Sequence, residues 1–337
     1  MMRLVGILLW GGLGLLPAFT ASALATSNFQ ESAPRKTSST LAPTSPRSAD
    51  KNWIEPTTGM GFVSLPGGCF AMGSAPYSEA GREDDEQPVH EVCLDPFWMG
   101  QHEVTNSQFI LFLNLIGRKN PKDKPWFATL GKKRDVQHHI IGGMGRFGVI
   151  SGQEGGPMTD VSWHGAQAFA QWLSQRNPGT FHLPSEAQWE YACRGGSTTP
   201  FHFGKTISAQ TQANFNGQHP YDNAPKEIQR PSPTPVGSFP ANTFGLHDLH
   251  GNVWEWLGDR YDEGFYGQEV ATQKNPCNDC DETSAGGSRV IRGGSWKGIG
   301  RWLRCANRNS AHAGEHDNGI GFRLVYQPPA DSSSGRR

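Results

Sequence analysis

The sequence predicts an α+β fold with little regular secondary structure, on the basis of three observations. The chain of 337 residues contains 42 Gly, 24 Pro and 11 Trp, which is typical of a loop-rich fold held together by aromatic packing. Three short helices, each with a side-chain cap, are predicted before Gly195. After Gly195 no long periodic segment occurs, and only short strands joined by long irregular connections are expected.

The N-terminal residues predict a secretory signal peptide. Arg3 precedes the uncharged run Leu4–Leu16, and small residues up to Ala25 offer two A-x-A cleavage sites. The alternative, a membrane-spanning helix, needs about 20 apolar residues, whereas this run is shorter and is followed by Pro17. We therefore predict a signal peptide at residues 1–25, a secreted or periplasmic protein, and no membrane span after cleavage.

Composition divides the remaining chain. Residues 26–51 are rich in Ser, Thr, Pro and Ala, so they cannot bury enough apolar surface to offset the entropy of ordering and predict a disordered linker. Residues 327–337 predict a disordered tail for the same reason, which leaves residues 52–326 as the folded part. The chain has a formal net charge of -1 and 18% charged residues, and no basic patch that would predict a nucleic-acid or anionic-membrane partner.

Strands are expected at both ends of the folded part. Residues Phe62–Gly73 predict two short strands around a Pro-Gly-Gly turn, and Val89–Leu94 predicts a strand that returns to this block. The acidic stretch Glu83–Glu86 is predicted to be an exposed, solvated loop rather than a calcium-binding segment. Further short strands are predicted at Val290–Arg292 and Phe322–Val325.

Each predicted helix begins at a side-chain cap. Thr105 and Gln108 form a capping box, and Ser185 and Gln188 form another. Ser162 caps the helix between them. Apolar residues at helical spacing predict the buried faces of the first two helices, and two aromatic residues lie in the third. These residues are Phe109, Phe112, Leu113 and Ile116, then Ala166, Phe169, Ala170 and Leu173, and finally Trp189 and Tyr191.

Six cysteines in an exported protein favour disulfides, although the residues alone do not select the pairing. Cys69 and Cys93 each lie in a strand-like run and are candidates for linking neighbouring strands. Cys277 and Cys280 form a C-x-x-C motif, which can bind a soft metal or act as a redox pair. An oxidising compartment favours the simpler alternative, a local disulfide within the loop.

Three blocks near the C-terminus carry a family resemblance. They are Gly251–Trp256 (GNVWEW), Ile291–Trp296 (IRGGSW) and Gly319–Leu324 (GIGFRL). In this order they resemble the formylglycine-generating enzymes, also called sulfatase-modifying factors. The resemblance implies a C-type-lectin-like fold, so residues 52–326 are expected to form a sulfatase-modifying-factor-like domain. It also implies a structural disulfide between Cys193 and Cys305, whose surroundings match paired family positions.

The resemblance implies a calcium site in the segment Asp248–Glu255 (DLHGNVWE). Its ligands would be the Asp248 side chain, the carbonyl oxygens of Gly251 and Val253, and the Glu255 carboxylate. Calcium binds carboxylate and carbonyl oxygens, and a tight turn at glycine can bring them together. The alternative is a turn in which Glu255 accepts hydrogen bonds from backbone amides. We predict a structural calcium ion.

The resemblance also implies a reaction centre from which the metal ligands are missing. Active members bind copper(I) through two cysteines that follow the RGGS segment, because thiolates suit this soft ion. In this chain Lys297–Arg304 contains no cysteine. Trp254, Arg292 and Ser295 match other residues of the family pocket and are the catalytic candidates. We expect no tight copper(I) binding and no cysteine oxidation by the family route.

Four of the arginines in this C-terminal part have two possible roles. They are Arg292, Arg304, Arg308 and Arg323. Such side chains can line a groove for a peptide or an anionic group, or they can pair with Glu190, Glu255 and Asp259. The resemblance of Arg292 and Arg323 to both active and inactive members favours structural ion pairs.

Three functions remain. The preferred one is an exported maturation or accessory factor that acts on a protein or peptide partner without the two-cysteine copper site. An exported family oxidase that matures a peptide siderophore chromophore also lacks these cysteines, which favours this interpretation. The alternatives are a non-catalytic lectin-like binding module and a formylglycine-generating oxidase with a displaced copper site. An open pocket around Trp254, Arg292 and Ser295 would favour a catalytic or peptide-binding role, whereas Trp296 and Trp302 filling that space would favour a passive binding module.

Overall fold

The computed structural model describes residues 45–46, 50–74, 80–117, 126, 140–143, 146–280 and 287–329. The predicted signal peptide at 1–25 lies outside these residues, as do most of the predicted linker at 26–51 and of the predicted tail at 327–337. Among the residues that the structure describes, no helix has the length and apolar character needed to cross a membrane.

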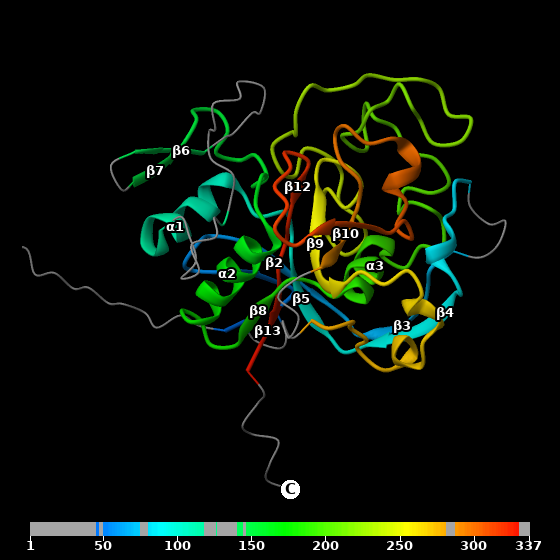
Figure 1. Ribbon diagram of the computed structural model, residues 1–337, viewed down its shortest axis with the longest axis horizontal. Helices are drawn as coiled ribbons and strands as arrows, with labels where there is room; N and C mark the ends of the chain where they lie inside the picture. Colours follow the sequence, from blue (N-terminus) through cyan, green and yellow to red (C-terminus); the bar gives the residue numbers. More distant parts are fainter. Residues whose placement is uncertain are drawn as a thin grey trace, which may run out of the picture. The chain divides into compact units, whose positions relative to one another are not determined.

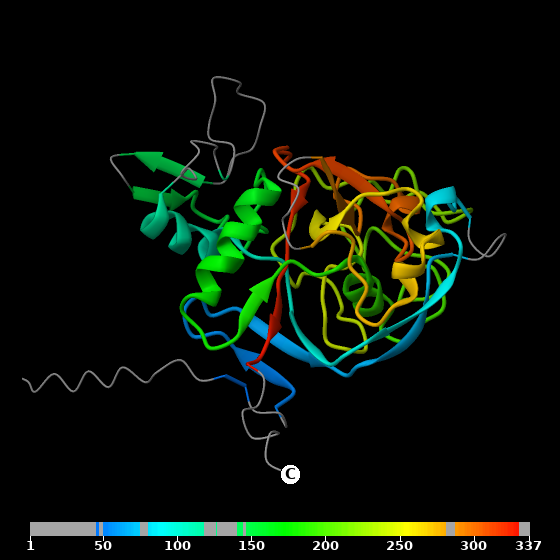
Figure 2. The same ribbon diagram turned by 60° about the horizontal axis from the view of Figure 1, so that its bottom comes forward.

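A five-stranded antiparallel sheet joins the two ends of the described chain (Figures 1 and 2). In spatial order its strands are β1 (Asn52–Ile54), β2 (Gly61–Leu65), β5 (Phe97–Gly100), β13 (Val325–Gln327) and β8 (Thr180–His182). Because β13 lies next to β5, the last strand is inserted among strands from the first half of the domain.

The two faces of this sheet pack against different helices, because successive side chains of a strand point to opposite sides. Phe62 of β2 and Trp98 of β5 belong to a core that also contains the aromatic residues of α1 (Asn106–Ile116) and α2 (Trp163–Ser174). The neighbouring Val63 and Met99 belong to a second core with α3 (Glu186–Arg194). Figures 1 and 2 show α1 and α2 on one side of β2, β5 and β13, and α3 on the other.

The helices begin where the sequence predicts. Thr105 with Gln108, and Ser185 with Gln188, form complete capping boxes, and the Ser162 side chain caps α2. The predicted face of α2 is buried. The face predicted for α1 is correct except at Ile116, which is 47% exposed because the last turn of the helix extends beyond the core.

A second sheet carries the C-terminal blocks. Its spatial order is β11 (Asn309–His312), β10 (Ser288–Arg292), β9 (Trp254–Arg260) and β12 (Ile320–Gly321). The remaining strands of the described chain form two hairpins: β3 (Gly68–Met72) with β4 (His90–Leu94), and β6 (Ile140–Gly143) with β7 (Arg146–Val149). The described residues also contain four 3-10 turns, which in chain order are η1 (Asp84–Glu86), η2 (Phe265–Gly267), η3 (Glu269–Thr272) and η4 (Gly300–Leu303). The α+β class with little regular structure is therefore confirmed.

Two predictions for individual segments were wrong. Of the strand predicted at Phe322–Val325, only Val325 is in a strand, because residues 322–324 carry the buried chain from β12 in one sheet to β13 in the other. The acidic stretch Glu83–Glu86 is not simply an exposed loop. Its Asp85 and Glu86 are buried in η1, where Glu86 forms an ion pair with Arg304 at 2.6 Å.

Candidate functional site

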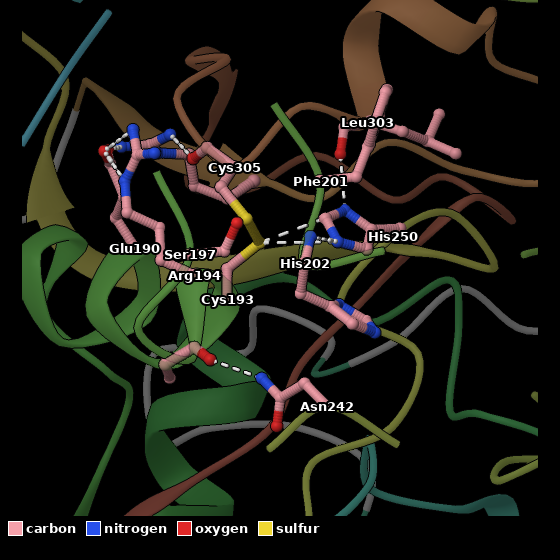
Figure 3. The surroundings of a disulfide bond; sticks show 12 residues. Glu190, Cys193, Arg194, Ser197, Phe201, His202, Asn242, His250, Leu303 and Cys305 are labelled. Atoms are coloured by element: carbon pink, nitrogen blue, oxygen red, sulfur yellow. Dashed lines mark hydrogen bonds and ion pairs between the residues drawn. A yellow bond between two sulfur atoms is a disulfide. The ribbon is translucent and has the colours of Figure 1, made fainter. Parts of the chain in front are cut away.

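A disulfide between Cys193 and Cys305 joins the end of α3 to the chain after η4, and the pairing implied by the resemblance is confirmed (Figure 3). His250 lies beside it, with Nδ1 3.9 Å from Cys193 Sγ. Nδ1 also lies 2.6 Å from the Leu303 carbonyl oxygen, and Nε2 accepts from the His202 backbone N–H at 3.2 Å. Burial, and secondarily His202, lowers the pKa of His250 well below its usual range. His250 is therefore a neutral structural group with both ring nitrogens engaged.

The other two disulfides also form. Cys69 pairs with Cys93 directly across the β3–β4 hairpin, and Cys277 pairs with Cys280. In the chain-entropy model a disulfide stabilises more when it closes a longer loop. The 112-residue separation of Cys193 and Cys305 corresponds to roughly 5 kcal/mol, and the separation of 3 between Cys277 and Cys280 to roughly 2 kcal/mol.

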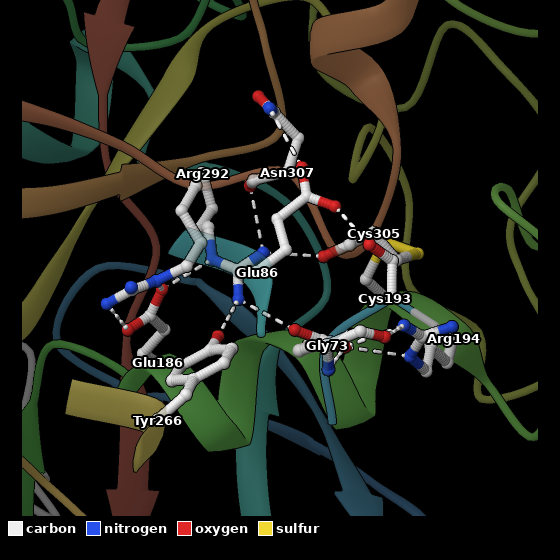
Figure 4. A network of polar contacts seen from close by, with 12 residues as sticks. Gly73, Glu86, Glu186, Cys193, Arg194, Tyr266, Arg292, Cys305 and Asn307 are labelled. Carbon is white, nitrogen blue, oxygen red and sulfur yellow. Dashed lines mark hydrogen bonds and ion pairs between the residues drawn. A yellow bond between two sulfur atoms is a disulfide. The ribbon is translucent and has the colours of Figure 1, made fainter. Parts of the chain in front are cut away.

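Arg292, a catalytic candidate, is fully buried and holds α3 against the C-terminal chain (Figure 4). All five of its N–H groups donate to protein oxygens. The acceptors are Glu186 Oε1 (2.9 Å), Glu190 Oε2 (2.7 Å), Tyr266 OH (2.9 Å), and the carbonyl oxygens of Cys305 (2.7 Å) and Asn307 (2.8 Å). No N–H group of this guanidinium remains for a substrate, so its role is structural.

Three further arginines of the C-terminal part are also buried in ion pairs. Arg304 pairs with Glu86 (2.6 Å), Arg308 with Glu186 (2.8 Å), and Arg323 with Glu255 (2.8 Å). This supports the structural interpretation over a groove lined by arginines. Asp259, an expected partner, instead accepts hydrogen bonds from two backbone N–H groups.

The three family pocket residues are buried. Trp254 and Ser295 are 7% and 1% exposed, and Arg292 is fully buried. The ring of Trp302 packs against Trp254, with their centroids 6.4 Å apart, and the indole N–H of Trp296 donates to the Asn318 carbonyl oxygen at 3.2 Å. The contact of Trp302 with Trp254 favours a passive binding module over a catalytic or peptide-binding role at these three residues.

The predicted calcium segment forms a tight, buried turn. Asp248, Gly251 and Asn252 all have positive φ angles, and a Cβ on Gly251 would lie 2.4 Å from the Asn214 carbonyl oxygen. Only glycine permits this approach. Val253 is buried between the turn and β9.

The acids near this turn differ in whether a carboxylate oxygen remains available to bind a cation. Asp248 Oδ2 accepts from the Gly237 N–H at 2.6 Å, and its buried Oδ1 has no hydrogen-bond partner. Glu255 instead accepts two hydrogen bonds from Arg323 at 2.8 Å and one from the Trp189 indole at 2.9 Å. The structure therefore argues for Asp248 and against Glu255 as a ligand.

A further acid, Glu103, lies near this turn and was not predicted as a site residue. Its Oε1 accepts from the Asn252 amide at 2.9 Å, and its buried Oε2 has no hydrogen-bond partner. Burial, and secondarily the Asp248 charge, raises the pKa of Glu103 well above its usual range. A cavity of about 30 Å³ lies beside it. The local sequence does not distinguish Glu103 from an exposed acid, because its neighbours Asp248 and Asn252 come from a distant segment of the chain.

A larger cleft of about 630 Å³ lies beside the segment that follows the RGGS block. It is lined by residues 80–81, parts of 218–226, and Ile299 and Arg301. The wall is closely packed, since the Gly300 N–H donates to the His219 carbonyl oxygen at 2.9 Å and a Cβ on Gly300 would lie 2.4 Å from a backbone nitrogen. This cleft could not be predicted from the sequence, because its walls come from separate loops.

The fold and the C-terminal blocks define a protein of the sulfatase-modifying-factor class. A family model described as "Sulfatase-modifying factor enzyme 1-like domain" matches residues 50–328. The chain belongs to this family, whose fold is C-type-lectin-like, and the predicted resemblance is confirmed.

Individual relatives agree with this assignment. The chain is 31% identical to the formylglycine-generating enzyme of Streptomyces coelicolor, covering 83% of this chain and 93% of that protein. It is 35% identical to the serine/threonine-protein kinase pkn1 of Chlamydia caviae over 78% of this chain, but spans only 37% of that relative's length. The structure of PvdO from Pseudomonas aeruginosa is similar, with a TM-score of 0.64, 30% identity, and coverage of 82% of this chain and 97% of that chain.

Proposed function

We propose that this protein is an exported maturation or accessory factor that binds a protein or peptide partner without the two-cysteine copper site of active family members. One observation carries the proposal. All six cysteines are paired in disulfides, and none lies in the segment Lys297–Arg304. Copper(I) needs soft ligands such as thiolates, so this segment offers it no ligand pair.

The cleft beside this segment is the proposed partner site. Its volume of about 630 Å³ is in the range of ligand sites in proteins. Tyr221 and Ile299 offer apolar contact, and the two positive charges of Lys226 and Arg301 outnumber the negative charge of Asp222. A peptide segment with adjacent apolar and acidic side chains suits this lining. The buried positions of Trp254 and Ser295 support binding rather than chemistry at the family centre.

A photo-crosslinking experiment tests this function. The amino acid p-benzoylphenylalanine is placed at position Ile299 of the full chain, and in a control at Leu115, which is 66% exposed on α1. We expect irradiation in cells of the source organism to link an exported protein or peptide to the Ile299 variant only. In parallel, purified protein supplied with copper(I), oxygen and a cysteine-containing peptide should form no aldehyde above the protein-free background. Aldehyde formation would instead support the displaced-copper alternative.

We also propose that a structural calcium ion binds at Asp248, together with the free oxygen of Glu103. The unpartnered, buried oxygens of both acids support this assignment, because calcium binds carboxylate oxygen and its charge would offset theirs. The ion would hold the turn before β9 in place. Glu255 would not take part, because Arg323 already holds both of its oxygens.

Calcium removal should lower thermal stability. A ligand at 100 times its Kd stabilises the folded state by about 2.7 kcal/mol, which corresponds to a Tm change of roughly 5 to 10 °C for a domain of this size. Calorimetry in EDTA and in millimolar calcium measures this difference, and Asp248→Asn should reduce it. A calcium-independent Tm in the wild-type protein would contradict the proposed site.

A further inference from the structure

The Cys277–Cys280 turn is fastened to β9 by its second residue. The Asn278 carbonyl oxygen accepts from the Arg260 backbone N–H at 2.8 Å, and the Asn278 amide donates back to the Arg260 carbonyl oxygen at 2.9 Å. The Asn278 backbone N–H donates to Asp259 Oδ1 at 2.9 Å. These bonds fix the two sulfurs relative to the buried side chain of Asp259.

The Asp259 carboxylate contacts the disulfide directly. Its Oδ2 lies 3.6 Å from Cys280 Sγ, and single ligand atoms of Asp259, Cys277 and Cys280 all lie within 4.8 Å of one another. Cys280 Sγ also lies against Gly258, where an added Cβ would be 3.0 Å away. Both cysteines are only partly buried, whereas Asp259 is 1% exposed.

The Asp259 carboxylate accepts structural hydrogen bonds but has no cationic partner among the described residues. Its hydrogen-bond donors are the backbone N–H groups of Glu186 (2.7 Å) and Asn278 (2.9 Å), and within the described chain no Lys or Arg side chain bonds to it. Burial, and secondarily the Glu186 charge, raises the pKa of Asp259 to about 7, although Arg308 acts in the opposite direction. A group with this pKa both holds and releases a proton near neutral pH. The disulfide it touches closes the shortest loop of the three and so contributes least to stability.

We propose that Cys277 and Cys280 form a redox-active pair that exchanges a disulfide with a protein or peptide dithiol, and that Asp259 transfers the proton of Cys280. This activity goes beyond the proposed partner binding and does not depend on it. Gly258 and Asp259 pack against Cys280, so a partner thiolate approaches Cys277 while Cys280 leaves.

The exchange balances in two steps. A partner thiolate attacks Cys277 Sγ, the Cys277–Cys280 bond breaks, and the leaving Cys280 thiolate takes the proton held by Asp259. The second partner thiol then loses its proton to the Asp259 carboxylate and attacks the partner sulfur of the mixed disulfide, which releases the Cys277 thiolate. The partner dithiol loses two electrons and becomes a disulfide, and the protein pair gains them. A second disulfide, such as oxidised glutathione, restores the starting state.

The first test uses the oxidised wild-type protein. It is equilibrated in mixtures of reduced and oxidised glutathione, quenched with acid, alkylated with N-ethylmaleimide and analysed by peptide mass. We expect Cys277–Cys280 to be reduced in mixtures that leave Cys69–Cys93 and Cys193–Cys305 oxidised. A Cys277–Cys280 pair that resists reduction as strongly as the other two disulfides would overturn the proposal.

The second test concerns Asp259. Oxidation of a synthetic two-cysteine peptide is followed from pH 5 to 9 with oxidised glutathione as the terminal oxidant. We expect Asp259→Asn to slow the protein-dependent rate at least tenfold at pH 7 and to remove an inflection near that pH, whereas Glu263→Gln, an exposed acid nearby, should match the wild type. An unchanged rate and profile in Asp259→Asn would refute the proton transfer. If this variant does not fold, the pH profile of the wild-type rate provides the test. A profile explained by titration of the thiols alone would also refute proton transfer by Asp259.

Discussion

Replacing Arg292 with Met should lower the free energy of unfolding by about 3 to 5 kcal/mol, the usual cost of removing one partner from a buried ion pair. The substitution keeps much of the side-chain volume but removes five donated hydrogen bonds. Glu186 and Glu190 would retain only Arg308 and Arg194 as charged partners. The two carbonyl oxygens and the Tyr266 hydroxyl would lose a donor in a buried environment, which adds to the cost.

Urea denaturation of Arg292→Met measures this loss, and Arg301→Met is the matched control. Arg301 is exposed on η4, so its replacement should change the free energy of unfolding by less than about 0.5 kcal/mol. A loss below about 1 kcal/mol for Arg292→Met would show that the surrounding chain relaxes around the missing guanidinium. The network would then not hold α3 in place.

The second large effect is expected at the Cys193–Cys305 disulfide. The double variant Cys193→Ser/Cys305→Ser should lose roughly 5 kcal/mol in the chain-entropy model, which corresponds to a decrease in Tm of roughly 10 to 20 °C. The separations of the three disulfides are 112, 24 and 3 residues. The losses should therefore fall in the order Cys193–Cys305, Cys69–Cys93, Cys277–Cys280. Thermal unfolding of the three double variants checks this order, and a smaller loss for Cys193–Cys305 than for Cys277–Cys280 would reverse it.

Local signals predicted the helices well. A capping box is complete within four residues, so Thr105 with Gln108 and Ser185 with Gln188 could be recognised without the rest of the fold. The strand β9, the longest in the described chain, was not predicted. Nearly all of its residues are buried because both faces of the strand are covered, so apolar and polar residues do not alternate along it.

Long-range partners explain most of the remaining errors. Glu86 was predicted to be solvated because its partner Arg304 lies 218 residues away. Glu103 was not predicted as a site residue because its neighbours Asp248 and Asn252 come close to it only in the folded chain. The C-x-x-C motif could be recognised in the sequence, but its contact with Asp259 could not. The contact forms only because the chain folds back onto β9 after the loop.

Photo-crosslinking from position Ile299 is the most direct test of the central claim, that the family scaffold here binds a partner beside a centre without copper ligands. We expect a defined adduct between the Ile299 variant and one exported protein or peptide, with no such adduct from Leu115. Addition of unlabelled partner should compete with the adduct, and Arg301→Glu should reduce its yield if acidic side chains occupy the cleft. Equal adducts from both positions would contradict partner binding at this cleft.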